Sequence, residues 1–220
     1  MNLPDGLLTG AWTLLGWLLF IPVFLLTVWR APWRRLADTS CFNLWLGMIV
    51  CLMLLWNLQA GIKPGLSLHL VGATVFSLAV GPQLAFIGLC AVLVGVSLNG
   101  AAGWETFAVN ALLTGGVAVL VTQAVLRFNE RFLPANLFVY IFANGFLGAA
   151  LALLATGISA SAFLVSAGAY PASYVLDEYL PYVMLLAFSE AWLSGMIVTL
   201  FVLYRPEWVS TFEDSRYLRD

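Results

Sequence analysis

Residues 66–82 read LSLHLVGATVFSLAVGP, and the fold depends on whether this stretch belongs to one helix or to two. It contains the only histidine of the chain, His69, and it closes on Gly81 and Pro82. Apolar residues continue beyond the proline to about residue 98. The histidine therefore stands at the head of a long apolar run that has a helix-breaking pair near its middle.

The composition indicates that such apolar runs cross a lipid bilayer. The chain has 220 residues, of which 62% are hydrophobic and 9% are charged, and its mean hydropathy is +0.97. Long apolar stretches with few charges are typical of transmembrane helices. The net charge of −2, without a large basic patch, argues against nucleic acid as a partner. We expect an all-α polytopic membrane protein.

Apolar runs occupy most of the sequence. They lie at roughly 8–29, 42–60, 68–98, 104–126, 136–160 and 179–204. The third run is ambiguous, because a single helix of that length would measure ~46 Å against a hydrocarbon core of ~30 Å. Two helices, at about 68–80 and 83–98, would each measure only ~20–26 Å. Because Pro82 cannot donate a backbone hydrogen bond and clashes with the preceding turn, the sequence favours two short helices broken at Gly81 and Pro82.

The basic residues distinguish the possible topologies. With seven helices and the N-terminus outside, all eight arginines lie on the cytoplasmic side and only Lys63 lies outside. With six helices and the same start, three basic residues lie inside and six outside, and the reverse start gives six inside and three outside. The positive-inside rule therefore favours a seven-helix bundle with its N-terminus outside and its C-terminus in the cytoplasm.

The same pattern predicts a single transmembrane domain over residues 1–206, followed by a short cytoplasmic tail at 207–220. Short apolar helices are stable in a membrane only where protein rather than lipid covers their ends. We therefore expect residues 68–98 to face the bundle interior, with His69 at its outer mouth. Shortened or broken helices often mark the binding site of a transporter.

Four polar side chains fall at or near membrane depth, where each is a functional candidate. His69 is either an interfacial residue or a metal ligand, since neutral imidazole is a common ligand. Asn110, Asn144 and Glu190 are either interhelical hydrogen-bonding groups or part of a polar site. No lysine or arginine shares the depth of Glu190, so this side chain is either protonated or holds backbone donors of the broken helix pair.

Catalytic signatures are missing from the sequence. It has no His-Glu-x-x-His, Walker A or Gly-x-Ser-x-Gly motif, so it lacks these routes to proteolysis, ATP hydrolysis and serine chemistry. Glu190 and His69 would have to act together as acid and base, and the predicted topology places them at different depths. We predict no catalytic residues.

Four stretches resemble the CbiM/NikM family, the substrate-binding membrane components of energy-coupling-factor cobalt and nickel transporters. MNLPDGLL at the start resembles the family's Met-His-Ile-x-Glu-Gly-Phe opening. HLVGATVFSLAVGPQLAFIGL resembles its His-Leu-x-Gly-Ala stretch with a Gly-Pro turn, and FAVNALLTG resembles its Gly-Ala-Asn-x-x-Asn-Met-Gly segment. FSEAWLSGMIVTLFVLYRPEW is similar to its Gly-Glu-x-x-x-x-Gly helix, which ends in Arg-Pro-Glu.

The resemblance implies that an N-terminal segment, residues 1–7, is inserted into the bundle towards the outer face. It also implies a square-planar set of metal ligands, of which this sequence retains the Met1 amine, the Asn2 backbone nitrogen and His69. The fourth ligand of the family is a histidine side chain at residue two, where this chain has Asn2. A carboxamide is a poorer ligand than imidazole for Ni²⁺ or Co²⁺.

The asparagine at residue two leaves three explanations open. The site binds the same metal weakly, with water or the Asn2 amide oxygen in the fourth position. It binds another metal or a small organic cation. Or it has lost metal binding and kept the fold, because function resides in the site and not in the fold.

The resemblance implies a substrate-specificity subunit that takes up a divalent transition-metal ion, cobalt or nickel, as cargo and holds no tightly bound cofactor. Its implied partners are a membrane coupling subunit and cytoplasmic ABC ATPases, in the bacterial cytoplasmic (inner) membrane. Two alternatives remain: the same fold binds a non-metal solute, or the chain is a non-transporting membrane assembly or regulatory protein.

Overall fold

The computed structural model describes residues 2–61 and 63–217, and these are mostly helical. The elements in chain order are α1 (Gly10–Arg30), η1 (Trp33–Ala37), α2 (Thr39–Asn57), β1 (Ala60–Gly61), β2 (Ser67–Leu68), α3 (Ala73–Val80), α4 (Pro82–Leu98), α5 (Phe107–Asn110), η2 (Ala111–Gly116), α6 (Val117–Phe132), α7 (Leu137–Val139), η3 (Tyr140–Leu147), α8 (Gly148–Ser166), α9 (Ala172–Glu178), α10 (Leu180–Tyr204), η4 (Pro206–Trp208) and α11 (Asp214–Tyr217). The segments η1 and η4 are 3₁₀ turns, whereas η2 and η3 are π-helical and continue α5 into α6 and α7 into α8.

Within the described residues, five helices are long and apolar enough to cross a membrane. They are Gly10–Arg30, Thr39–Asn57, Phe107–Phe132, Leu137–Ser166 and Leu180–Tyr204. The shorter helices α3 and α4 lie among them, and the only strands in the described chain are the two residues each of β1 and β2. This confirms the prediction of an all-α polytopic membrane protein.

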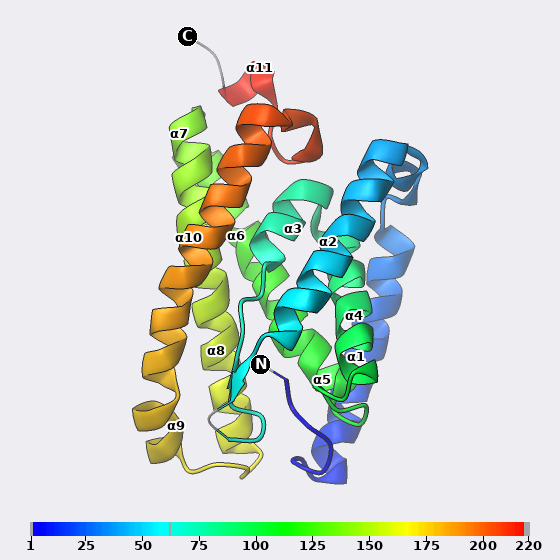
Figure 1. Ribbon diagram of the computed structural model, residues 1–220, viewed down its shortest axis with the longest axis vertical. Helices are drawn as coiled ribbons and strands as arrows, with labels where there is room; N and C mark the ends of the chain where they lie inside the picture. Colours follow the sequence, from blue (N-terminus) through cyan, green and yellow to red (C-terminus); the bar gives the residue numbers. More distant parts are fainter. Residues whose placement is uncertain (1, 62, 218–220) are drawn as a thin grey trace.

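The helices form two groups with α3 between them. The helices α6, α8 and α10 pack together on one side, with α8 beside α10, and α1, α2 and α4 form the other side (Figure 1). The short helix α3 contacts α4 and α6 and lies at the centre of the bundle (Figure 1). All eight of its residues are buried, which is how an element of only ~12 Å is accommodated in a membrane.

The chain breaks between α3 and α4 at the predicted pair. The helix α3 ends at Val80, Gly81 adopts a φ of 89°, and α4 begins at Pro82. A positive φ is readily available to glycine, and a proline in the first helical position lacks an N–H that would in any case have no helical partner. The predicted break is confirmed.

The start of the first short helix is not where the sequence analysis placed it. Residues 68–72 are not helical, and α3 begins at Ala73. Gly72 has a left-handed φ of 66°, and β2 pairs antiparallel with β1 in the register Ala60–Leu68. The predicted helix over about 68–80 is therefore shorter by five residues at its start, because this backbone bonds to other parts of the chain.

The C-terminal end of α3 is closed by groups from distant parts of the sequence. The Ser210 N–H donates to the Ala79 carbonyl at 2.9 Å. Arg35 donates through Nη1 to the Val80 carbonyl at 3.2 Å. The last carbonyls of a helix have no partner within the helix, so these bonds stabilise α3 where it would otherwise expose them inside the bundle.

Arginines from several elements gather at this end of the bundle, which we call the arginine-bearing end. Arg35 reaches α3, and Arg216 of the C-terminal tail forms an ion pair with Glu130 of α6 at 3.1 Å. Arg30 ends α1 five residues before Arg35. The C-terminal segment lies at this same end, at the top of Figure 1.

Candidate functional site

The N-terminal segment enters the bundle and is held there by its backbone. Leu3 is 1% exposed. Its N–H donates to Asn110 Oδ1 at 2.8 Å, and its carbonyl accepts from Asn110 Nδ2 at 3.1 Å. The same carbonyl accepts from the Thr106 hydroxyl at 2.6 Å and from the Gly103 N–H at 2.9 Å. One carboxamide therefore satisfies both backbone groups of Leu3, much as a neighbouring strand would.

Asn2 lies against the two short strands. Its N–H donates to Ser67 Oγ at 2.9 Å, and its Nδ2 donates to Gln59 Oε1 at 3.1 Å. Gln59 is in turn oriented by a donation from its Nε2 to the Ala101 carbonyl at 3.4 Å. The Asn2 Oδ1 atom is buried and accepts no hydrogen bond from the described residues. Gln59 thus fixes the orientation of the Asn2 amide and leaves its oxygen available as a ligand.

His69 lies on the same stretch as Ser67, two residues further on. Alternate residues of an extended chain point to the same side, which places His69 on the side of Ser67 that meets Asn2. The imidazole is 3% exposed and its ring centroid lies 4.9 Å from that of Trp56. Trp56 also donates through Nε1 to the Val71 carbonyl at 3.1 Å, so this residue supports both the ring and the backbone of the segment.

The surroundings of His69 favour a neutral imidazole. His69 lies outside the spanning helices, and burial lowers its pKa well below the ordinary value. Its Nδ1 lies 3.1 Å from the Leu70 carbonyl. Because a carbonyl can only accept, this bond places the proton on Nδ1 and the lone pair on Nε2. A neutral ring whose other nitrogen is held by a carbonyl is the usual form of a metal-ligating histidine.

Glu190 of α10 holds the backbone that follows His69. Its Oε2 accepts from the Val71 N–H at 2.9 Å, and its Oε1 accepts from the Gly72 N–H at 2.8 Å and from the Ser194 hydroxyl at 3.2 Å. These contacts correct the expectation that Glu190 and His69 lie at different depths. The non-helical segment before α3 brings the chain to the carboxylate within three residues of His69.

The remaining predicted residues fall in different places. Asn144 is 3% exposed, but it accepts a hydrogen bond from Asn129 at 2.8 Å, in a region that also contains Arg216 near the arginine-bearing end. Asn144 is thus separated from the His69 site. Met1 lies outside the described residues. Gln59, Ser67 and Trp56 were not singled out from the sequence, and the only local signal was the two-residue spacing of Ser67 and His69.

The donor groups near His69 define what the site can bind. In the part of the chain that the structure describes, no three His, Cys, Asp or Glu side chains come together. A cation here would be held by one imidazole together with amide and N-terminal groups. His69 also lines a cavity of about 20 Å³, with Thr156 and Tyr179 on its wall. That space admits one water molecule or a small ion.

Solved structures share this fold. A crystal structure described as a truncated transition metal transporter has a TM-score of 0.73 with 18% sequence identity, over 93% of this chain and 99% of that chain. A second, described as a transition metal transporter, has a TM-score of 0.72 with 18% identity, over 91% of this chain and 92% of that one. No curated protein matches the sequence.

The sequence itself matches a protein family over most of its length. The family model is that of CbiM, described as the cobalt uptake substrate-specific transmembrane region, and it covers residues 2–208. The inserted N-terminal segment, the buried His69 and the broken α3–α4 pair all lie within this range. The chain therefore belongs to the CbiM family.

Proposed function

We propose that the protein is the substrate-specificity membrane subunit of an energy-coupling-factor uptake transporter, and that its cargo is a divalent transition-metal ion such as Co²⁺ or Ni²⁺. The observation that carries this proposal is the insertion of the N-terminal segment. Leu3 is fixed by Asn110, and this places Asn2 against the strand that leads to His69.

The ligands would be the Met1 amine, Asn2 and the Nε2 atom of His69. The Asn2 N–H is engaged with Ser67, so the buried Asn2 Oδ1 is the readier donor of that residue. Imidazole suits Ni²⁺, Co²⁺ and Zn²⁺, whereas a carbonyl oxygen is a weaker ligand for these ions. This set would bind a divalent ion less tightly than one with two imidazoles.

The space beside His69 is small. The cavity that His69 lines has a volume of about 20 Å³, the space of one water molecule, and its other walls come from α8 and α10, at Thr156 and Val183, and not from Asn2. Pockets for organic ligands of drug size are commonly ~300–1,000 Å³. The cavity beside His69 is far smaller than this, which favours a small ion as the cargo over an organic solute.

Transport would draw its energy from partner subunits, a membrane coupling subunit and cytoplasmic ABC ATPases. The arginine-bearing end would face the cytoplasm by the positive-inside rule, with seven helices and the N-terminus outside. The bacterial cytoplasmic (inner) membrane is the matching location. In this arrangement α3 joins the metal site, through Gly72 and Glu190, to the cytoplasmic surface at Ser210.

Metal-dependent thermal stabilisation of the detergent-purified protein tests this function. A ligand at 100 times its Kd raises the free energy of unfolding by ~2.7 kcal/mol, which raises the Tm of a chain of this size by ~5–11 °C. We expect one of Ni²⁺, Co²⁺, Zn²⁺ or Mn²⁺ to give such a shift when the N-terminus is native. His69→Ala and a short extension before Met1 should each abolish the shift relative to their own metal-free protein.

An extension of the same length at the C-terminus is the matched control and should retain the shift. If no metal stabilises the native protein, the proposed cargo is wrong. Stabilisation by a small organic cation alone would then assign the same fold to a non-metal solute, and no stabilisation by either would favour an assembly or regulatory role.

A further inference from the structure

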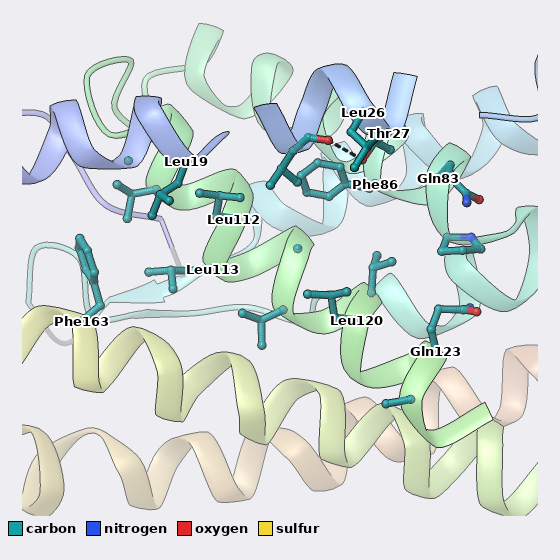
Figure 2. A pocket seen from close by; sticks show the side chains of 18 of the residues that line it. Leu19, Leu26, Thr27, Gln83, Phe86, Leu112, Leu113, Leu120, Gln123 and Phe163 are labelled. Atoms are coloured by element: carbon teal, nitrogen blue, oxygen red, sulfur yellow. Dashed lines mark hydrogen bonds between the residues drawn. The ribbon is translucent and has the colours of Figure 1, made fainter. Parts of the chain in front are cut away.

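A groove lies between α1 and the segment α5–η2–α6. Its volume is about 820 Å³. Figure 2 shows apolar side chains lining most of it, among them Leu19 on α1, Phe86 on α4 and Leu113 and Leu120 on the opposite wall. This groove is some forty times larger than the cavity beside His69, at about 820 Å³ against about 20 Å³.

The helix α1 packs most closely on the bundle near Gly16. A Cβ added to Gly16 would meet Val109 Cγ2, so the backbones of α1 and α5 approach tightly there. Phe20 is the last buried residue of α1, and Phe24, one turn further on, is only partly buried against it. The later turns of α1 and the facing turns of α6 line an apolar wedge that extends to the arginine-bearing end.

One end of the groove is polar and positively charged. Arg30 at the end of α1 and Arg127 of α6 both line it, together with Gln83 and Gln123, which lie on separate helices at the same end of the groove in Figure 2. Both arginines are exposed. Neither forms an ion pair with any carboxylate in the described residues. Two uncompensated guanidinium groups thus stand at the mouth of an apolar channel.

The dimensions match one leaflet of a bilayer. From Arg30 back to Leu19 is eleven residues of helix, or ~16 Å, and half of a hydrocarbon core is ~15 Å. An acyl chain whose head group lies at the arginines would therefore reach the level of Leu19 and Leu113. Basic pockets between transmembrane helices are known to bind anionic lipid head groups, and Arg in particular matches the geometry of a phosphate.

We propose that this groove is a binding site for an anionic phospholipid of the leaflet at the arginine-bearing end. The phosphate lies between Arg30 and Arg127, the amides of Gln83 and Gln123 contact the head group, and an acyl chain fills the apolar wedge between α1 and α6. The lipid site shares no residue with the proposed metal site, so an experiment can refute one of the two proposals and leave the other standing.

Native mass spectrometry of the delipidated protein in detergent tests the site. The protein is titrated with phosphatidylglycerol and with phosphatidylcholine of the same acyl chains. An arginine near a membrane surface contributes roughly a fivefold preference for anionic lipid, so two predict about a thirtyfold preference for the first phosphatidylglycerol molecule. The double variant Arg30→Gln/Arg127→Gln should lose it. The double variant Arg34→Gln/Arg131→Gln, which removes the same charge from the same end, should retain it.

A second pair of variants tests the apolar part of the groove. A Cβ at Gly116 meets only ordinary contacts, at 3.5 Å from Phe86, so Gly116→Leu adds a side chain to the wedge without a clash at its Cβ. It should weaken the binding of both lipids at least about tenfold, whereas Gly47→Leu, which faces open space on α2, should not. Equal loss in both charge variants, or full binding in Gly116→Leu, would overturn the proposal. Unchanged lipid binding in Gly116→Leu, with loss of assembly with partner subunits, would assign the groove to a partner helix instead.

Discussion

Replacing Glu190 with alanine should destabilise the protein strongly, because two backbone groups depend on its carboxylate. The Val71 and Gly72 N–H groups donate to it at 2.9 and 2.8 Å, and the side chain is 2% exposed. A buried donor left without a partner costs about 1–3 kcal/mol, so two cost about 2–6 kcal/mol. Glu190→Gln keeps one accepting oxygen and turns an NH₂ group towards the other N–H, so about 1–3 kcal/mol is expected.

Thermal unfolding in detergent, followed by tryptophan fluorescence, measures these losses. At ~2–4 °C per kcal/mol for a chain of this size, Glu190→Ala should lower the Tm by at least ~4 °C and Glu190→Gln by at least ~2 °C. Glu207→Gln is the matched control, because its ion pair with Arg205 is exposed, at 3.5 Å, and such pairs contribute little. A Tm for Glu190→Ala within ~1 °C of the unmodified protein would refute the role given to this carboxylate.

Two further substitutions test the segments on either side of the site. Gly72→Ala should lower the free energy of unfolding by about 1–2 kcal/mol, because Gly72 has a left-handed φ of 66°. The new Cβ would also clash with Leu52 Cδ2. The Tm of this variant should fall while that of Gly47→Ala, which faces open space, does not; equal Tm values would contradict this. Asn110→Leu removes both bonds to Leu3, so amide hydrogen exchange in residues 3–8 should accelerate. Unchanged protection there would show that Asn110 does not hold the N-terminal segment.

The break between α3 and α4 could be predicted because its cause is local. Gly81 and Pro82 act through their own backbone chemistry, and the length of the apolar run could be compared with the thickness of a bilayer. His69 could be singled out for the same kind of reason, since it is the only histidine and stands at the head of that run.

The start of α3 was placed too early because its local signal is short. Residues 66–70 alternate between apolar and polar side chains, which favours an extended path, but the apolar run that follows them masks this alternation. The structure holds them through Glu190, 118 residues away from Gly72, and the left-handed Gly72 adds a turn that the sequence does not distinguish from a small packing residue. The depth of Glu190 relative to His69 was misjudged for this reason.

The polar partners of Asn2 could not be predicted either, because they are distant from it in the sequence. Gln59 lies 57 positions from Asn2, and Ala101 lies a further 42 positions from Gln59. Only the packed fold brings these groups together and leaves the Asn2 oxygen without a hydrogen-bond donor among the described residues. Asn144 is the opposite case, a residue that the sequence singles out but that lies elsewhere. It is buried, yet it accepts a hydrogen bond from Asn129 and does not contribute to the site.

The most direct test of metal binding is equilibrium dialysis of the protein with a native N-terminus, followed by elemental analysis of the bound metal. The unmodified protein, His69→Ala and Asn2→His are compared with Ni²⁺ and Co²⁺. We predict one divalent ion per chain in the unmodified protein, none in His69→Ala, and tighter Ni²⁺ binding in Asn2→His, because imidazole is a better ligand than a carboxamide. Metal that remains bound to His69→Ala, or its absence from both the unmodified protein and Asn2→His, would contradict a metal site built on His69 and the inserted N-terminus.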